Sequence, residues 1–360
     1  MKKRVLYFDI LKIISVFFVI LIHVISEYWY NLKVESPNFI GLSFLDSLSR
    51  FCVPIYFMVS GALFLNEEKK VTIKDALKKY IPRILLIFIF WNLVYSFLNI
   101  IILGEKSLNF KTVIEIILNT ILGKGIFHLY FLPVLMGFYL CLPVLKYITK
   151  KENKDILKYL IILLFIFISL NKFLTYVLGT SISYSITFGG YLIYFIIGYY
   201  LNTFEIDNKN TRIIYLLGIL GFTITFAGTV VCSRLFGMTE VFFNYLSFNV
   251  ILYASAVFLF AKNKFKKANE KVINILTSTH FGIYLIHGLV LGLLEVIGMF
   301  KLFDKLTIPI SVLLSSIIIY LVSLISIIIG IKIPIIKNLI SLDKKRWFLS
   351  SFLYFYGFKF

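Results

Sequence analysis

Charged residues and cysteines are scarce in this chain of 360 residues. Only 15% of the residues are charged, and the three cysteines (Cys52, Cys141 and Cys232) lie far apart in apolar segments. This spacing excludes a metal-binding cysteine motif, and three distant cysteines give no even disulfide framework. Internal repeats, low-complexity segments and polar linkers are also absent from the sequence. We therefore expect one membrane-embedded domain over residues 1–360.

Apolar residues make up most of the chain instead. The AVILMFWYC fraction is 60%, and the mean hydropathy is +0.92. A soluble domain of this length could not bury so much apolar surface. Because about 20 apolar residues cross a bilayer as a helix, the chain has room for about ten crossings with short loops. The sequence predicts an all-α, polytopic integral membrane protein with about ten transmembrane helices.

Apolar segments locate these crossings. They cover residues 7–29, 51–65, 84–103, 128–145, 159–178, 189–201, 213–231, 246–261, a segment starting near 280, and 308–331. A polar stretch up to Ser49 separates the first two. Asn171 and Lys172 interrupt the fifth, so the positions of the fifth and sixth stay open. Residues 104–127 contain KTVIEIILNTIL, which is amphipathic at helical spacing and is expected on the outer surface.

The formal net charge of +19 is concentrated in alternate loops. Lys and Arg gather at the N-terminus, after the even-numbered crossings and in the C-terminal Lys344-Lys345-Arg346. This pattern follows the positive-inside rule, so we expect both termini in the cytoplasm and no nucleic-acid partner. The basic start could be mistaken for a secretory signal. Because Asp9 and Lys12 interrupt the apolar run and no cleavage site follows, we expect a retained first helix.

Lys12 and His23 are ionisable residues inside the first crossing. They are eleven positions apart, which places them on nearly the same helix face, about 16 Å apart along the axis. Asp9 precedes Lys12 by three residues, a spacing at which the two can pair. Ionisable residues at membrane depth are expensive, and histidine exchanges protons near neutral pH. The alternative is that Lys12 reaches to the interface and His23 is a hydrogen-bonded core residue.

Three further segments carry polar residues at the ends of or within crossings. In SRFCVPIYFMVSG, Pro54 removes a backbone donor, the Ser60-Gly61 pair permits close helix approach, and Arg50 either serves the site or anchors to headgroups. His128 opens the fourth crossing in HLYFLP, which by composition is an interfacial aromatic belt. In THFGIYLIHG, His280 and His287 lie two turns apart on one face. No acidic or cysteine partner has ligand-like spacing, so no metal site is expected.

Together these motifs resemble the acyltransferase-three family of membrane proteins, with the nearest likeness to bacterial surface-polysaccharide O-acetyltransferases such as the one acting on enterobacterial common antigen. The matching residues, in chain order, are Asp9, Lys12 and His23; Ser49-Arg50, Val53-Pro54, Phe57-Met58 and Ser60-Gly61; His128-Leu129-Tyr130-Phe131; and Ser278, His280, Gly282-Ile283-Tyr284 and His287. Two positions depart from the family pattern. Lys12 replaces the usual arginine, and Tyr80 stands where the first of two paired arginines is expected before the third crossing.

The resemblance implies transfer of an acyl group, with acetyl expected, from cytoplasmic acyl-CoA to a hydroxyl of an envelope polysaccharide or its lipid-linked precursor at the bacterial plasma membrane. His23 is then the expected general base. Lys12, Lys79 and Arg83 would hold the coenzyme phosphates. The residues that would bind the acceptor or stabilise the oxyanion are Arg50, His128, Tyr130 and His287. The residues that would support the site structurally are Asp9, Ser60, Gly61 and His280.

Two other functions remain open at this point. A carrier or exporter of polysaccharide or lipid-linked sugar is one, because polytopic proteins with buried charges often transport. Internal repeats and paired broken helices, which are frequent in transporters, are not visible in the sequence. A non-catalytic membrane sensor is the other. Consumption of acetyl-CoA by the purified protein separates the enzyme from both.

The topology gives a first testable prediction. A reporter fused after residue 360, or a cysteine introduced near Lys344, should be accessible only from the cytoplasm, because the basic loops are retained there. Labelling of that cysteine by an impermeant reagent applied to intact cells would contradict the predicted orientation.

Overall fold

The computed structural model describes residues 5–103, 109–121, 127–178, 187–266 and 270–340. All regular elements in these residues are helical, and no strand occurs among them. The all-α prediction is therefore confirmed. Residues 1–4 and the basic tail around Lys344 lie outside the described residues.

The helices follow one another along the chain with short connections. Their bounds are α1 (Leu6–Trp29), α2 (Pro37–Ser49), α3 (Cys52–Phe64), α4 (Ile73–Asp75), α5 (Ile81–Leu103), α6 (Phe110–Ile121), α7 (Phe131–Ile148), α8 (Lys154–Leu178), α9 (Thr187–Thr203), α10 (Asn208–Phe236), α11 (Phe248–Lys264), α12 (Glu270–Val296), α13 (Ile308–Gly330) and α14 (Pro334–Ile340). Two short elements precede longer helices. A π-helix, η1 (Ala76–Tyr80), leads into α5, and a 3₁₀ turn, η2 (Phe127–Tyr130), leads into α7.

Eight helical segments of the described residues are long and apolar enough to cross a membrane. The chain is thus a multi-pass membrane protein. Helices α8 and α9 lie at the fifth and sixth predicted crossings but are not among the eight. The amphipathic stretch forms α6, which packs on α5.

Two boundaries differ from the sequence prediction. Part of the supposed polar stretch before Ser49 is helix α2, because Ser36 accepts a hydrogen bond from the Phe39 amide (3.2 Å) and Pro37 occupies the first turn. The apolar segment that results runs from Pro37 to Phe64. Helix α12 starts at Glu270, so His280 lies about 15 Å inside it rather than at its start.

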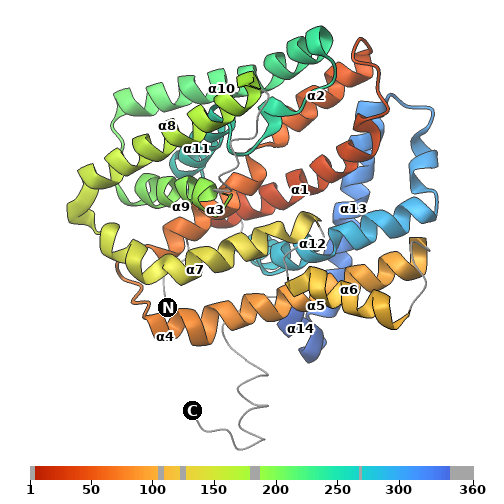
Figure 1. The fold of residues 1–360 in the computed structure, drawn as a ribbon, viewed down its shortest axis with the longest axis horizontal. Helices are drawn as coiled ribbons and strands as arrows, with labels where there is room; N and C mark the ends of the chain where they lie inside the picture. The colour runs from red at the N-terminus through yellow and green to blue at the C-terminus, as the bar shows by residue number, and fades with distance from the viewer. Residues whose placement is uncertain (1–4, 104–108, 122–126, 179–186, 267–269, 341–360) are drawn as a thin grey trace, which may run out of the picture.

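Helix α1 runs through the middle of the bundle, packed against α3, α12 and α13 (Figure 1). Helices α8 and α10 lie toward one edge in this view, and α5 and α6 toward the opposite edge. The site residues of α1 are therefore surrounded by protein rather than by lipid.

Helices α3 and α9 cross at glycines. A Cβ atom on Gly61 would lie 1.8 Å from the carbonyl oxygen of Phe195, and one on Gly198 would lie 2.0 Å from that of Met58. The two backbones are thus in direct contact, in a reciprocal arrangement with a glycine from each helix. Close backbone approach is how helices associate without a hydrophobic driving force between them.

A lysine closes the C-terminal end of each of these crossing helices. Lys146 of α7 donates to the carbonyl oxygen of Asn66 just after α3 (2.6 Å), and Lys262 of α11 donates to that of Leu201 near the end of α9 (2.6 Å). The Asn66 carbonyl oxygen also accepts from the Lys69 amide (3.1 Å), and at both helix ends a cation suits the negative end of the helix dipole. The same capping device therefore appears twice, although no repeat is visible in the sequence.

The crossing predicts a large effect for Gly61→Ala. Its methyl group would overlap a backbone carbonyl that cannot move independently, so we expect destabilisation of roughly 1–3 kcal/mol, the usual range for overpacking. Thermal unfolding in detergent measures it. Gly292→Ala is the matched control, because nothing lies within 4 Å of its Cβ position. Equal melting temperatures for the two variants would contradict the account of the crossing.

Candidate active site

Three histidine rings from distant segments meet inside the bundle. They are His23 of α1, His128 of η2 and His287 of α12. The ring centroids are 5.1 Å apart for His23–His287, 5.2 Å for His128–His287 and 5.9 Å for His23–His128. His280 lies outside this cluster, stacked on Tyr56 at 6.2 Å. The structure thus brings together three of the four histidines that the sequence singled out.

The hydrogen bond of His287 defines its tautomer. Its Nδ1 lies 2.6 Å from the carbonyl oxygen of Tyr284, and a carbonyl can only accept, so Nδ1 carries the proton. In the neutral ring, Nε2 then holds a lone pair. This Nε2 is buried and has no hydrogen-bond partner among the residues that the structure describes. His287 therefore offers an unused acceptor within the cluster of histidines.

His128 is held by its backbone and its ring. The Tyr284 hydroxyl donates to the His128 carbonyl oxygen (2.6 Å), and the Tyr95 ring packs edge-on against the imidazole at 4.6 Å. Gly288 makes room for both aromatic rings, since a Cβ there would lie 3.0 Å from a His128 ring carbon and 3.0 Å from the Tyr95 hydroxyl. The glycine that follows His287 thus permits His128 to approach α12.

Tyr95 of α5 makes two hydrogen bonds to the backbone of α12. Its hydroxyl donates to the Leu285 carbonyl oxygen (2.8 Å) and accepts from the Leu289 amide (3.2 Å). Residues 285 and 289 are the natural partners of one helical hydrogen bond, so the phenol bridges them. His287 lies between these two residues. Tyr95 therefore determines the local path of the segment that carries His287.

A cavity of about 300 Å³ opens beside the histidines. Its lining residues are Val19, Ile22, His23, Arg50, Val53, Tyr56, His128, Tyr130, Phe131, Tyr191, Tyr245, Phe281 and Tyr284. Aromatic side chains form most of the wall, and His23, His128, Arg50 and Tyr130 are the predicted site residues that line it. His287 is not part of the wall, because it is almost fully buried behind it.

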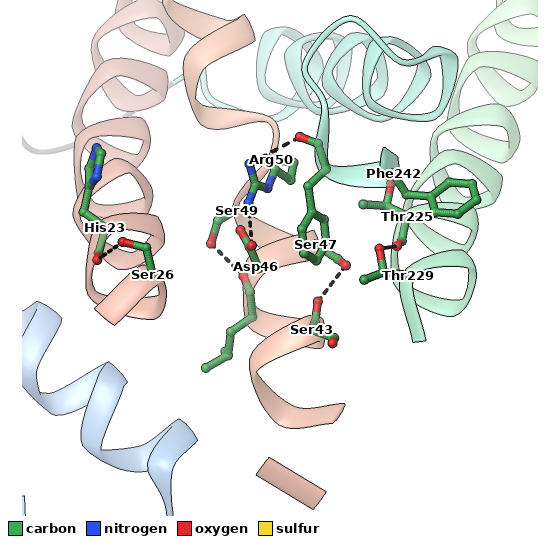
Figure 2. A network of polar contacts seen from close by, with 12 residues as sticks. His23, Ser26, Ser43, Asp46, Ser47, Ser49, Arg50, Thr225, Thr229 and Phe242 are labelled. Carbon is green, nitrogen blue, oxygen red and sulfur yellow. Dashed lines mark hydrogen bonds and ion pairs between the residues drawn. The ribbon is translucent and has the colours of Figure 1, made fainter. Parts of the chain in front are cut away.

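Arg50 lines the cavity as one half of a buried ion pair. Its guanidinium lies 2.5 Å from the Asp46 carboxylate, one turn earlier in α2, and donates to the Phe243 carbonyl oxygen (3.2 Å). Figure 2 shows this pair beside His23. The Phe243 ring covers the guanidinium at 4.5 Å. Arg50 is thus fixed inside the protein and does not anchor to headgroups.

A second group of polar residues lies nearer the start of α1. Lys12 pairs with Asp9 at 2.9 Å, and the Tyr56 hydroxyl donates to the Lys12 carbonyl oxygen (3.1 Å). Because Tyr56 also lines the cavity and stacks on His280, it connects the level of Lys12 with the histidine cluster. His280 itself is oriented by the Thr277 carbonyl oxygen, 2.6 Å from its Nδ1.

The remaining predicted residues occupy other positions. Lys79 is exposed on the π-helix η1, with its Nζ 5.8 Å from the Tyr80 ring, and Arg83 is half-buried in the first turn of α5. Gly61 forms the crossing with α9, and Ser60 is its half-buried neighbour. None of these four residues lines the histidine cavity.

Other possible sites in the described residues lack this chemistry. No group of three or more His, Cys, Asp or Glu side chains there is arranged to hold a metal ion. A second hollow of about 520 Å³ lies among α8, α9, α10 and α11, with Lys154 and Lys158 toward one end, and no histidine lines it. The histidine cavity is therefore the candidate active site.

Sequence reasoning missed several residues of this site. The ion pair of Asp46 with Arg50 could have been predicted from the sequence, because Asp46 precedes Arg50 by four residues and the two therefore share a helix face. No sequence pattern indicated a site role for Tyr95, Tyr191 and Tyr245, since single tyrosines in apolar segments are common at membrane interfaces.

A buried cluster of histidines beside an aromatic cavity, enclosed by membrane-crossing helices, defines a polytopic membrane enzyme. The chain matches the model of the acyltransferase-three family, described as an acyltransferase domain, over residues 5–332. It therefore belongs to this family and is a membrane acyltransferase. Comparisons with curated proteins and with solved structures gave no significant match.

The two hydrogen bonds from Tyr95 to α12 predict that Tyr95→Phe impairs turnover. Without the hydroxyl, the segment of α12 that carries His287 loses its connection to α5 and can shift, and small displacements of this kind cost roughly 10–100-fold in rate. Tyr253→Phe is the control, because its hydroxyl also joins two helices, donating to the Leu48 carbonyl oxygen (3.1 Å). We expect similar melting temperatures but a much lower kcat for Tyr95→Phe. Equal kcat values would contradict the positioning role of Tyr95.

Proposed function

We propose that this acyltransferase moves an acyl group, with acetyl expected, from cytoplasmic acyl-CoA to a sugar hydroxyl of a cell-envelope polysaccharide or of its lipid-linked precursor. The proposal places the enzyme in the bacterial plasma membrane. The observation that carries it is the position of His23, which forms part of the wall of a largely aromatic cavity inside the membrane bundle. A proton acceptor there can activate a hydroxyl away from bulk water.

The cavity wall favours a sugar as the acceptor. Tyrosine and phenylalanine rings present apolar faces on which the C–H faces of a sugar ring can stack, while phenol groups can bond its hydroxyls. Five tyrosines are among the lining residues: Tyr56, Tyr130, Tyr191, Tyr245 and Tyr284. A small number of polar groups in an otherwise apolar pocket is also typical of small-molecule sites.

The proposed reaction needs one proton acceptor. His23 takes the proton of the acceptor hydroxyl as its oxygen attacks the thioester carbonyl carbon. The C–O bond then forms, the C–S bond breaks, and the imidazolium returns the proton to the departing thiolate, which leaves as coenzyme A. A positioned base of this kind contributes typically 10²–10⁴-fold.

His287 fits the role of an orienting partner for this base. Its unprotonated Nε2 lies in the cluster next to His23, and a nucleophile's base is commonly oriented by a third group. An N–H of His23 directed to this acceptor would leave the other ring nitrogen unprotonated and free to face the cavity. Arg50 and His128, also on the wall, are candidates to stabilise the developing oxyanion.

The coenzyme would approach from the start of α1. Lys12, Lys79 and Arg83 all belong to the segments at the predicted cytoplasmic ends of α1 and α5, where cations can attract phosphates. Lys12 is paired with Asp9, whereas Lys79 is exposed, so Lys79 is the stronger candidate of these two for direct phosphate contact. The exposed position of Lys79 makes its contribution sensitive to salt.

The donor assignment predicts weaker acyl-CoA binding when these charges are removed. Lys79→Ala with Arg83→Ala should raise the dissociation constant of acetyl-CoA, and Lys12→Ala with Arg83→Ala should do the same. Added salt should reproduce part of the loss in the wild type. Lys154→Ala with Lys158→Ala, at the other hollow, is the control and should bind normally. Unchanged affinity in both donor-site variants would remove the assignment.

The catalytic assignment predicts that His23→Gln abolishes transfer, with a loss of roughly 10²–10⁴-fold, because glutamine can hydrogen-bond but cannot take the proton. Protein level and acetyl-CoA affinity should stay nearly normal. His280→Gln is the matched control, a membrane histidine outside the cluster, with a much smaller expected loss. Near-normal turnover in His23→Gln together with an inactive His287→Gln would identify His287 as the base instead.

A further inference from the structure

We propose that the cavity selects an uncharged sugar residue as the acceptor, and that Asp46 sets this preference by neutralising Arg50. This proposal rests on the proposed function and adds to it a substrate class and a specificity-determining residue.

Arg50 is the one permanently charged side chain on the described wall of the cavity. The remaining lining residues are apolar or phenolic, apart from His23 and His128, and no carboxylate is among them. Left alone, Arg50 would make the cavity a site for an anion, because its guanidinium matches carboxylate and phosphate geometry.

The positive charge of Arg50 is, however, already neutralised by the Asp46 carboxylate. Asp46 lies 2.5 Å away, and the side chains are only 14% and 5% exposed for Arg50 and Asp46. Another guanidinium nitrogen donates to the Phe243 carbonyl oxygen, while the rings of Phe243 and Tyr245 lie 4.5 and 5.6 Å from the guanidinium carbon. The charge is therefore matched inside the protein, and its two terminal nitrogens are engaged.

The neighbouring serines do not hydrogen-bond to the Asp46 carboxylate, so its negative charge interacts with Arg50. Ser47 and Ser49 on the same helix donate to the carbonyl oxygens of Ser43 and Leu45 (2.7 Å each), not to the carboxylate (Figure 2). One carboxylate oxygen, Oδ1, is buried without a partner. A buried ion pair contributes little to stability compared with apolar packing, so its place at a cavity wall points to a role in binding.

A cavity that is neutral overall rejects an anionic acceptor. A sugar carboxylate would lose its hydration without gaining a free counter-charge, and burying an unpaired charge is strongly unfavourable. Burying a neutral sugar costs much less hydration free energy than burying a sugar carboxylate. The Arg50 Nε, which has no partner, can donate to a hydroxyl or ring oxygen without changing the net charge.

The first test locates the acyl group. The full chain in lipid nanodiscs is incubated with acetyl-CoA and envelope glycans that contain both neutral and uronic acid residues, and fragmentation mass spectrometry identifies the acylated residue. We expect a preference for neutral residues of roughly 100-fold or more. Acylation of uronic acid residues at a similar rate would overturn the proposal and leave the proposed function intact. Acetyl-CoA consumption that depends on His23 but yields no acylated glycan would instead remove the proposed acceptor class.

The second test assigns the preference to Asp46. Asp46→Asn leaves Arg50 uncompensated, so the ratio of neutral to uronic acylation should fall at least about 10-fold, whereas Asp46→Glu keeps the charge and should keep the ratio. An unchanged ratio in Asp46→Asn would overturn the role of Asp46.

A double variant covers the case in which Asp46→Asn does not fold. Asp46→Asn with Arg50→Gln contains no uncompensated buried charge and should therefore be better tolerated. Its overall rate should drop, but its neutral-to-uronic ratio should stay near that of the wild type, because the wall is neutral again. A double variant that acylates both residue types equally would show that charge balance does not set the preference.

Discussion

The close crossing of α3 and α9 fixes the geometry on which the site depends. Gly61 and Gly198 bring the two backbones into contact, and Lys146 of α7 and Lys262 of α11 bind carbonyl oxygens at the C-terminal ends of α3 and α9. Helix α3 then presents Tyr56 to the cavity and α9 presents Tyr191. Helix α1 packs on α3, and α12 packs on α1, so His23 and His287 are positioned relative to the same crossing. A shift between α3 and α9 would therefore move two parts of the cavity wall relative to each other.

The second constraint is that polar groups inside a membrane need partners. Tyr56, Tyr95 and Tyr284 meet it by donating to backbone carbonyl oxygens of other segments, and these bonds tie the elements around the cavity together. The exceptions at this site include Nε2 of His128, Nε2 of His287, Nε of Arg50 and Oδ1 of Asp46, which are buried without partners among the described residues. Unpaired groups of this kind are costly. Unpaired polar atoms beside a cavity are what a site prepared for a polar reactant requires, and their presence here agrees with the acyltransferase family of the chain.

The sequence was sufficient for the fold class and for part of the site. Long apolar runs define membrane helices regardless of how they pack, and Lys12 and His23 were recognisable because helical periodicity alone puts them on one face. The meeting of His23, His128 and His287 was not predictable, because it depends on how α1, α12 and η2 cross. The hydrogen bonds from Tyr95 to α12, and the lysines of α7 and α11 at the ends of α3 and α9, likewise arise from tertiary contacts. Helix α2 was missed because the polar residues before Ser49 suggested a loop, although Ser36 and Pro37 are residues that commonly begin a helix. Asp46 was missed with it, although its spacing to Arg50 was visible.

The central claim is that acyl transfer takes place at the histidine cavity. A cryo-EM structure of the protein with a non-reactive thioether analogue of acetyl-CoA tests it most directly. The account predicts that the group replacing the acetyl lies in the cavity beside His23, within reach of its unprotonated nitrogen, and that the coenzyme phosphates lie near Lys79 and Arg83. An analogue bound in the hollow among α8, α9, α10 and α11, with the histidine cavity closed to it, would contradict the account.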